Sequence, residues 1–201
     1  MEAMVKKYQQ KYKKIKDEMD RWGDLHSRLL SQFSNAASII QRLQVIHKSR
    51  NYGGLKCVEG IEVAVLAKQV KSLQTILLSV NKILEDFCGV VLSIEKIVRD
   101  SRQLVKGWSA QLSTKQLNQQ IGIKPSLADC LDGLRLLEEM HQSEYNLKLS
   151  AVSALPELAL KPSGGGGDDL GALRQLLTDQ PNIPREEVQL IFDKVFAEEL
   201  C

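Results

Sequence analysis

The stretch of sequence that decides the fold runs from Leu66 to Val105 and reads LAKQVKSLQTILLSVNKILEDFCGVVLSIEKIVRDSRQLV. Its main row repeats at intervals of three and four and consists of Leu66, Val70, Leu73, Leu77, Val80, Leu84, Phe87, Val91, Ile94, Val98, Ser101 and Val105. This spacing forms one face of an α-helix, whereas a β-strand would require alternation. A neighbouring row recurs every seven residues and consists of Ile76, Ile83, Val90, Ile97 and Leu104. Together the rows predict a helix over residues 58–106 with a wide apolar face, suited to the centre of a bundle.

A stripe of the same kind lies upstream and predicts a first helix over residues 5–50. It consists of Val5, Tyr8, Tyr12, Ile15, Met19, Trp22, His26, Leu29, Phe33, Ala36, Ile40, Leu43 and His47. The flank of this stripe is polar early, at Lys11 and Glu18, and apolar later, at Ile39 and Ile46. A narrow seam suits one partner helix and a wide one suits a bundle. We therefore expect the second half to lie in a bundle and the lysine-rich first half to project or pair lightly.

A third helix is predicted over residues 126–160. Ser126 can accept a hydrogen bond at the N-cap, and Asp129 three residues later can reach back to it. The run Gly164–Gly167 predicts a flexible linker over residues 161–168. A C-terminal tail over residues 169–201 should hold two short helices, the last one introduced by Pro184, whose missing N–H is no loss in a first turn.

The predicted fold class is all-α. It comprises a long antiparallel helical hairpin with coiled-coil-like packing, a third packed helix, and a short C-terminal helical tail. The glycine-bearing segment 51–54 should reverse the chain between the two long helices. Residues 1–160 would then form an elongated bundle, with the seams pairing either within one chain or between two. Gly89, inside the second helix, is interpreted as a tolerated glycine rather than a mark of close helix approach.

Composition limits the classes of function. Of the 201 residues, 43% are hydrophobic and 26% charged, which is typical of a soluble globular chain. The net charge of +2 is too near neutral for a dedicated nucleic-acid binder, although bases gather near the start and acids near the end. We find no secretory signal, no apolar run long enough for a membrane span, and no CxxC pair among the four cysteines. A reducing compartment, cytosol or nucleus, is the expectation.

The usual catalytic motifs are missing from the sequence. There is no P-loop, GxSxG, HExxH or Rossmann fingerprint. His26 and His47 stand about 31 Å apart along one helix, so they cannot share an ion within a monomer and should instead fix register as partly buried polar residues. His141 is expected to be partly exposed. The sequence therefore predicts no enzyme, with no catalytic, metal-binding or cofactor-binding residues.

Two groups of residues are candidates for binding a partner. The first is a lysine cluster formed by Lys6, Lys7, Lys11, Lys13 and Lys14. It is either a solvated helix face or a contact with RNA, an acidic protein or a nuclear import receptor. The second is an apolar stripe in the tail formed by Val188, Ile191, Val195 and Phe196. This stripe can dock back on its own bundle or into the groove of a partner.

The start of the third helix carries a family resemblance. Its motif consists of Pro125, Ser126, Ala128, Asp129, Leu131, Leu134, Tyr145 and Lys148. This run resembles the AIRIM family of ribosome maturation factors, and Trp22, Leu29, Asn35 and Leu43 fall where that family has similar residues. The resemblance covers most of the chain, is specific around residues 125–148, and is closest to a plant branch of the family. The glycine run at 164–167 departs from the family pattern.

The resemblance implies a non-catalytic adaptor without cofactors. Members act with a AAA ATPase and a second small adaptor to release a recycling factor from cytoplasmic pre-60S ribosomal particles. It also implies partners of that kind, including the pre-60S particle. From the residues themselves, a weak RNA contact through the N-terminal lysines stays open and no membrane contact is expected. The expected location is cytoplasm and nucleus. A different class of function stays open from the residues alone, namely a coiled-coil tether or scaffold in trafficking or the cytoskeleton.

Overall fold

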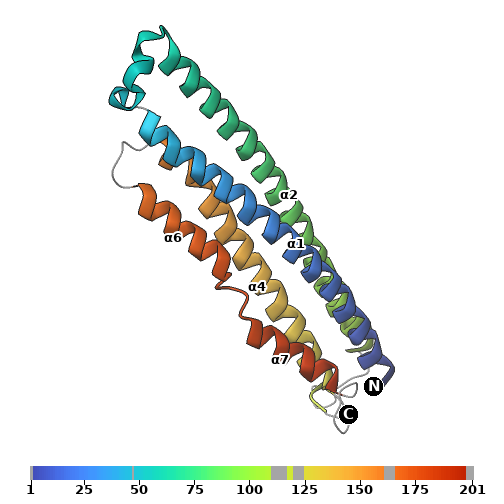
Figure 1. The fold of residues 1–201 in the computed structure, drawn as a ribbon. Coiled ribbons are helices and arrows are strands. Elements are labelled where there is room, and N and C mark those ends of the chain that lie inside the picture. The colour runs from blue at the N-terminus through green and yellow to red at the C-terminus, as the bar shows by residue number, and fades with distance from the viewer. Residues whose placement is uncertain (1, 47, 110–116, 120–124, 161–165, 198–201) are drawn as a thin grey trace. The chain divides into compact units, whose positions relative to one another are not determined.

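The computed structural model describes residues 2–46, 48–109, 117–119, 125–160 and 166–197. Its elements are α1 (Glu2–Ile46), the 3-10 segment η1 (Ser49–Cys57), α2 (Ile61–Ser109), α4 (Leu127–Ser153), α5 (Leu155–Leu160), α6 (Gly166–Asp179) and α7 (Arg185–Val195). Within the described ranges every regular element is a helix, so the predicted all-α class is confirmed (Figure 1). The chain divides into two compact units that cut across its long helices.

The first unit comprises Met1–Gly23, Phe87–Tyr145 and Gln180–Cys201. Its α1 and α2 segments run antiparallel, since Tyr8 hydrogen-bonds to the carbonyl of Ser101 while Glu18, further along α1, meets Ser93. The core of this unit is formed by Tyr8, Tyr12, Ile15, Trp22, Phe87, Val90, Ile94, Cys130, Leu134 and Leu137, each at most 3% exposed.

The lysine-rich first half of α1 does not project. Met4 and Val5 are buried, and Tyr8, Tyr12 and Ile15 are 0% exposed. The prediction that this half would project or pair lightly is wrong, because α2, α4 and α7 all supply contacts to it. The narrow apolar stripe suggested a single partner helix. Its two tyrosines have long side chains, however, and they hydrogen-bond to two different helices.

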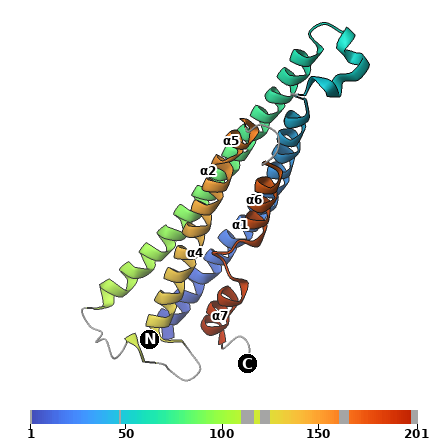
Figure 2. The same ribbon diagram turned by 90° about the vertical axis from the view of Figure 1, so that its left-hand side faces the viewer.

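The second unit comprises Asp24–Asp86 and Asn146–Asp179. Its core is formed by Leu29, Phe33, Ala36, Ile40, Val80, Ile83, Leu155, Leu158, Leu170 and Leu177, each at most 4% exposed. Helix α6 lies along the second half of α1 in this unit (Figure 2). The expectation that this half of α1 lies in a bundle is confirmed by these buried side chains.

Several predicted boundaries need correction. Helix α1 ends at Ile46 rather than near residue 50, and a 3-10 segment follows in which Gly53 has a φ of 48°. The third predicted helix is broken at Ala154 into α4 and α5, because Pro156 has no N–H to donate to the Val152 carbonyl, as an unbroken helix would require. Helix α6 begins at Gly166, inside the predicted linker, with two aspartates in its first turn to favour that end. The linker residues 161–165 lie outside the described ranges.

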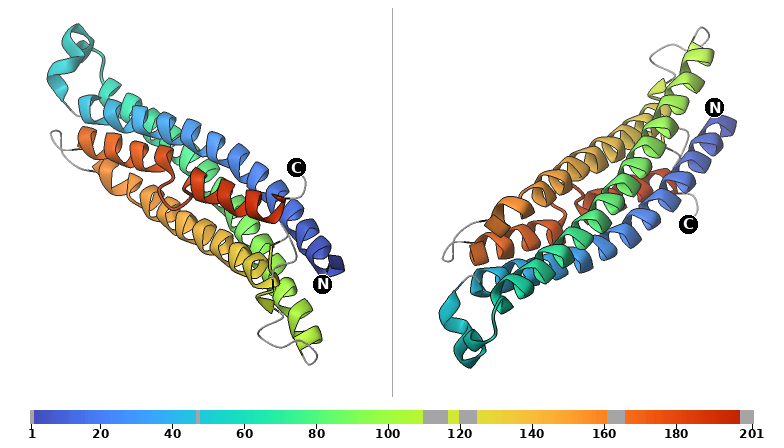
Figure 3. Two further views of the ribbon diagram at one scale, coloured as in Figure 1. Left: turned by 90° about the horizontal axis from the view of Figure 1, so that it is seen from below. Right: turned by 90° about the horizontal axis from the view of Figure 1, so that it is seen from above.

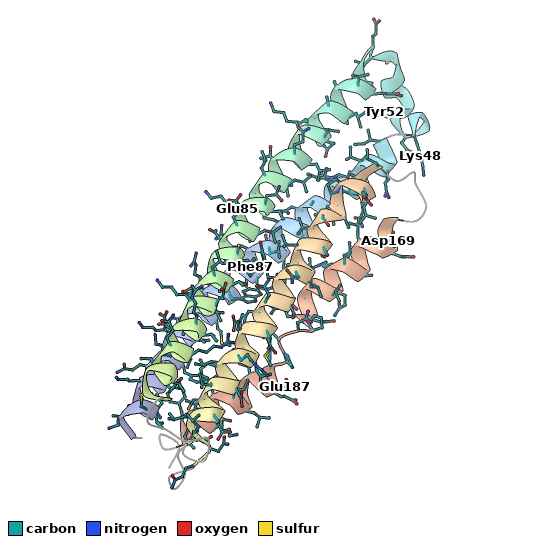
Figure 4. All side chains as sticks on the ribbon, turned by 180° about the vertical axis from the view of Figure 1, so that it is seen from behind. Lys48, Tyr52, Glu85, Phe87, Asp169 and Glu187 are labelled. Atoms are coloured by element: carbon teal, nitrogen blue, oxygen red, sulfur yellow. The ribbon has the colours of Figure 1, made fainter. Side chains whose placement is uncertain are left out.

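The wide apolar face of α2 is buried along most of its length, as predicted. Ile83, Val90 and Ile97 are buried, at 2%, 0% and 9% exposure, while Ile76 is half-buried. Phe87 points toward the interior (Figure 4). Val70, however, is 38% exposed, so the predicted row is not covered at its N-terminal end.

Candidate interaction surfaces

The family motif begins with a capping box at the start of α4. The Ser126 hydroxyl accepts a hydrogen bond from the Asp129 backbone N–H over 3.1 Å. In return Asp129 Oδ2 accepts from the Ser126 backbone N–H at 3.1 Å and from its hydroxyl at 2.7 Å. The predicted N-cap is therefore confirmed, and Pro125 and Ser126 are buried beside it.

The same aspartate joins α4 to the tail. Lys194 Nζ of α7 lies 2.7 Å from Asp129 Oδ1. Burial alone would raise the pKa of Asp129, but the hydrogen bonds from Lys194 and Ser126 outweigh it and lower this pKa below its usual value. A charged Asp129 therefore stabilises both the start of α4 and the position of α7.

Tyr12 stands at the centre of this junction. Its hydroxyl donates to the carbonyl of Cys130 over 2.9 Å, and its ring meets Phe192 and Phe196 edge-on at centroid distances of 5.6 and 6.5 Å. Gly133 permits this approach, since a Cβ there would lie 2.9 Å from Ile191 Cγ2 and would also meet the Tyr12 hydroxyl. Burial raises the pKa of Tyr12 well above its usual range, so the phenol stays protonated.

Helices α1 and α7 therefore approach α4 closely at Gly133, a position that was not predicted to have this role. Gly89 is exposed, and only Arg21 comes within 4 Å of a Cβ built on it, which agrees with the interpretation of a tolerated glycine. Gly133 follows no regular pattern in the sequence, and only its contacts with two other helices reveal its role.

The apolar stripe of the tail docks on its own unit. Val188 and Val195 are buried, Ile191 and Phe196 are half-buried, and Gln9 Nε2 donates to the Val195 carbonyl over 3.2 Å. Helix α7 lies along the first part of α1 (Figure 3). In the structure this stripe packs on helices of its own chain, which is the first of the two predicted alternatives.

Buried polar side chains hold the segment between α6 and α7. Trp22 Nε1 donates to Gln180 Oε1 over 2.9 Å, and Asn182 donates to Glu144 Oε2 from its backbone N–H at 3.2 Å and its side-chain amide at 3.1 Å. Glu144 is fully buried. Its burial was not predicted, because an isolated glutamate on a helix usually faces water.

His141 and His26 differ in burial. His141 was expected to be partly exposed, but it is 1% exposed, because its ring packs edge-on against Trp22 at 5.0 Å and its Nδ1 lies 2.7 Å from the Leu137 carbonyl. His26 is half-buried, as expected, and its Nδ1 lies 3.4 Å from Nζ of the buried Lys148. His47 lies outside the described residues.

The other motif residues lie on α4. Leu134 is buried, and Ala128, Leu131 and Tyr145 are half-buried. Burial raises the pKa of Tyr145, with a further contribution from Cys88. None of these side chains is fully exposed, so the motif that carries the family resemblance is packed within the protein.

The lysine cluster forms the outer side of the first part of α1. Lys6, Lys7, Lys13 and Lys14 are exposed, whereas Lys11 is half-buried and 3.8 Å from Asp100. The Lys13 ammonium lies over the Phe196 ring at 5.8 Å from its centroid. The cluster is therefore accessible, with two of its members also touching α2 or the tail.

A second accessible surface lies on the N-terminal part of α2. Val63 and Leu78 are each 71% exposed, Val70 is 38% exposed, and Ala67 is also exposed. We call the set Val63, Ala67, Val70, Gln74 and Leu78 the α2 stripe. Val70 was predicted to lie in the buried row and this surface was not predicted, because an apolar repeat has the same sequence pattern whether or not another helix covers it.

The first unit also has a hollow of about 400 Å³ between α2 and α4. It is lined by Val91, Glu95, Arg102, Glu138, Glu139, Gln142 and Ser143. Burial raises the pKa of Glu138, an effect that the charge of Arg102, 3.3 Å away, opposes. Over the described ranges no cluster of three histidine, cysteine or acidic residues could hold a metal ion. In the same ranges no helix is long and apolar enough to cross a membrane.

The helices and surfaces define an all-α protein with accessible basic and apolar helix faces. The chain belongs to the C1orf109-like family of ribosome biogenesis proteins, whose family model matches residues 2–200. This match confirms the family resemblance and indicates a role in ribosome biogenesis, while the plant branch stays a prediction. A comparison with curated proteins found no match to the chain.

Proposed function

We propose that this protein is a non-catalytic adaptor that works with a AAA ATPase in the cytoplasmic maturation of the 60S ribosomal subunit. The observation that carries the proposal is the family match over residues 2–200, which covers nearly the whole chain. An adaptor needs accessible surface for its partners, and the lysine cluster and the α2 stripe supply basic and apolar surface respectively.

The thiol of Cys130 is not suited to nucleophilic catalysis. Cys130 lies in the first turn of α4 and is 0% exposed. Burial, and next the nearby charge of Asp129, raise the pKa of the Cys130 thiol to about 12. A buried thiol that stays protonated at neutral pH is a poor nucleophile.

The proposed partners follow the family function. They are a AAA ATPase, a second small adaptor protein and the pre-60S particle, with a weak RNA contact through Lys6, Lys7, Lys11, Lys13 and Lys14. Pre-60S particles mature in the nucleus and the cytoplasm, and we expect the protein in both. A partner could reach Val188 and Val195 only after α7 leaves α1, so we assign the partner contacts to the exposed surfaces.

The test is affinity purification of the full chain from native extract, followed by mass spectrometry. We expect a AAA ATPase and 60S maturation proteins to be enriched. Depletion of the protein should lower the ratio of free 60S to free 40S subunits in a sucrose gradient. Enrichment of vesicle or cytoskeletal proteins with an unchanged subunit ratio would favour a coiled-coil tether instead.

A further inference from the structure

The α2 stripe has the spacing of a helix-binding face. Its members Val63, Ala67, Val70, Gln74 and Leu78 follow one another at intervals of four, three, four and four. Such intervals align side chains on one side of a helix, here over roughly 22 Å. Leu66 and Leu77, on the flank toward the core, are half-buried. Apolar surface thus continues from the core out to the α2 stripe.

Along the length of the α2 stripe, from Val63 to Leu78, the charged residues of α2 are all lysines. Between Glu62 and Glu85 the chain holds Lys68, Lys71 and Lys82 and no acidic residue. All three lysines are exposed, and at 3.6 residues per turn they fall on the same flank of the stripe. Glu85, which ends this acid-free stretch, points away from the bundle (Figure 4), and it follows Leu78 by seven residues, so it limits the α2 stripe at its C-terminal end.

We propose that the α2 stripe binds an amphipathic helix of a partner protein that carries acidic residues beside its apolar face. Val63, Val70 and Leu78 would enter the apolar face of that helix, as in other helix–helix recognition. Lys71 and Lys82 would face its carboxylates and set its orientation. The inference builds on the proposed adaptor role, because it specifies the chemistry of one partner contact.

Charge and side-chain type favour this occupant over two others. A second copy of the chain would bring like-charged lysine flanks together, which opposes pairing. Single-stranded RNA is held by aromatic stacking platforms next to positive charge, and residues 61–85 contain no aromatic residue and no arginine. Exposed valine and leucine at helical spacing suit a protein helix instead.

The experiment measures binding of the full chain to a fluorescently labelled helical peptide by anisotropy. The probe peptide has leucine at the heptad a and d positions and glutamate at e and g. A control peptide has lysine at e and g. We expect the acidic peptide to bind the parent chain at least ~10-fold more tightly than the lysine peptide does, a difference that 0.5 M salt should reduce.

Variants of the chain locate the contact. Val70→Glu combined with Leu78→Glu should weaken binding of the acidic peptide at least ~10-fold. The control variant Leu190→Glu alters an equally exposed leucine, at 67% against 71% for Leu78, and should bind like the parent. Circular dichroism should show equal helicity for all three proteins. Equal binding by the double variant, or equal binding of the two peptides, would overturn the proposal.

Further outcomes distinguish an acidic partner helix from other occupants of the α2 stripe, and they distinguish failure of this proposal from failure of the proposed adaptor role. Light scattering that shows a concentration-dependent dimer, lost in the double variant, would assign the α2 stripe to self-association and overturn the proposal. So would loss of bound RNA in that variant with peptide binding intact. If the double variant still purifies with the AAA ATPase and loses only peptide binding, the stripe serves another partner protein and the adaptor role stands. If peptide binding depends on the stripe but no AAA ATPase purifies with the parent, the proposed function fails and the binding site stands.

Discussion

The first turns of α1 and of α2 carry apolar repeats of similar regularity, but they lie in opposite environments. In the first unit, Tyr8 and Tyr12 of α1 are 0% exposed and receive partners from α2, α4 and α7. In the second unit, Val63 and Val70 of α2 are 71% and 38% exposed. The comparison shows that a heptad repeat gives a helix an apolar face, which another helix can bury but does not always bury. The number of helices that reach the repeat decides whether its apolar side chains are buried in the core or stay exposed.

The largest expected effect is at Tyr12. Replacement by alanine removes a buried ring and its hydrogen bond to the Cys130 carbonyl, and should lower the free energy of unfolding by about 3–5 kcal/mol. The matched change Val70→Ala on the α2 stripe should cost less than about 0.5 kcal/mol. Urea denaturation measures both. Similar midpoints for the two variants would contradict the comparison between the covered and the open repeat.

Within α2 the comparison can be repeated on one residue type. Leu84→Ala should destabilise by about 2–5 kcal/mol, because Leu84 is 6% exposed and its loss opens a cavity. Leu78→Ala, at a leucine that is 71% exposed, should lie within about 0.5 kcal/mol of the parent. Thermal and urea unfolding should rank the two variants in this order. A Leu84→Ala midpoint equal to that of the parent would show that Leu84 is not core.

A pair of glycine variants should change stability in opposite directions. Gly133→Ala places a Cβ against Ile191 and the Tyr12 hydroxyl and should destabilise by about 1–3 kcal/mol. Gly171→Ala in α6 meets nothing within 4 Å and should stabilise by about 0.5–1 kcal/mol through its better helix propensity. Calorimetric melting of both variants checks the signs. A stabilising Gly133→Ala would mean that α7 does not pack closely on α4.

The Asp129 junction should depend on pH. Asp129→Asn weakens the capping box and the contact with Lys194, which should cost about 1 kcal/mol at neutral pH. Since the folded-state pKa of Asp129 is lowered, its contribution is fully present above the ordinary value near 4 and is lost as the pH falls through the lower folded-state value. The stability difference between parent and variant should therefore shrink in acid. Asp132→Asn, at an exposed position of the same helix, is the control and should stay within about 0.5 kcal/mol at every pH.

The smallest effect on stability is expected at the lysine cluster. Changing Lys6, Lys7, Lys11, Lys13 and Lys14 to glutamine should leave helicity nearly unchanged, because four of the five are exposed and surface ion pairs contribute about 0–1 kcal/mol. Association with RNA or with ribosomal particles should weaken, as it would with added salt. Filter binding at low salt and circular dichroism measure the two properties. Unchanged association with RNA or ribosomal particles would show that the lysine cluster is only a solvated helix face.

The long helices could be predicted because their signal is local. The spacing of apolar residues in α1 and α2, the absence of proline from the first 124 residues and the capping box at Ser126 each depend on neighbours in the chain. The break at Ala154 was missed, although Pro156 marks it, since the apolar pattern continues through it. The burial of Glu144 and His141 could not be predicted, because their partners Asn182 and Trp22 are far away in sequence.

The sequence by itself determined that the chain is helical, where α4 is capped, and that it resembles a ribosome biogenesis family, because periodicity, caps and motifs are written in consecutive residues. Only the tertiary structure decided which stripes are covered. It placed α7 on Tyr12 and Gly133 and left Val63 and Leu78 exposed. The physical reason is that burial depends on which distant helix supplies the other side of an apolar contact, and the apolar spacing of one helix contains no information about that partner.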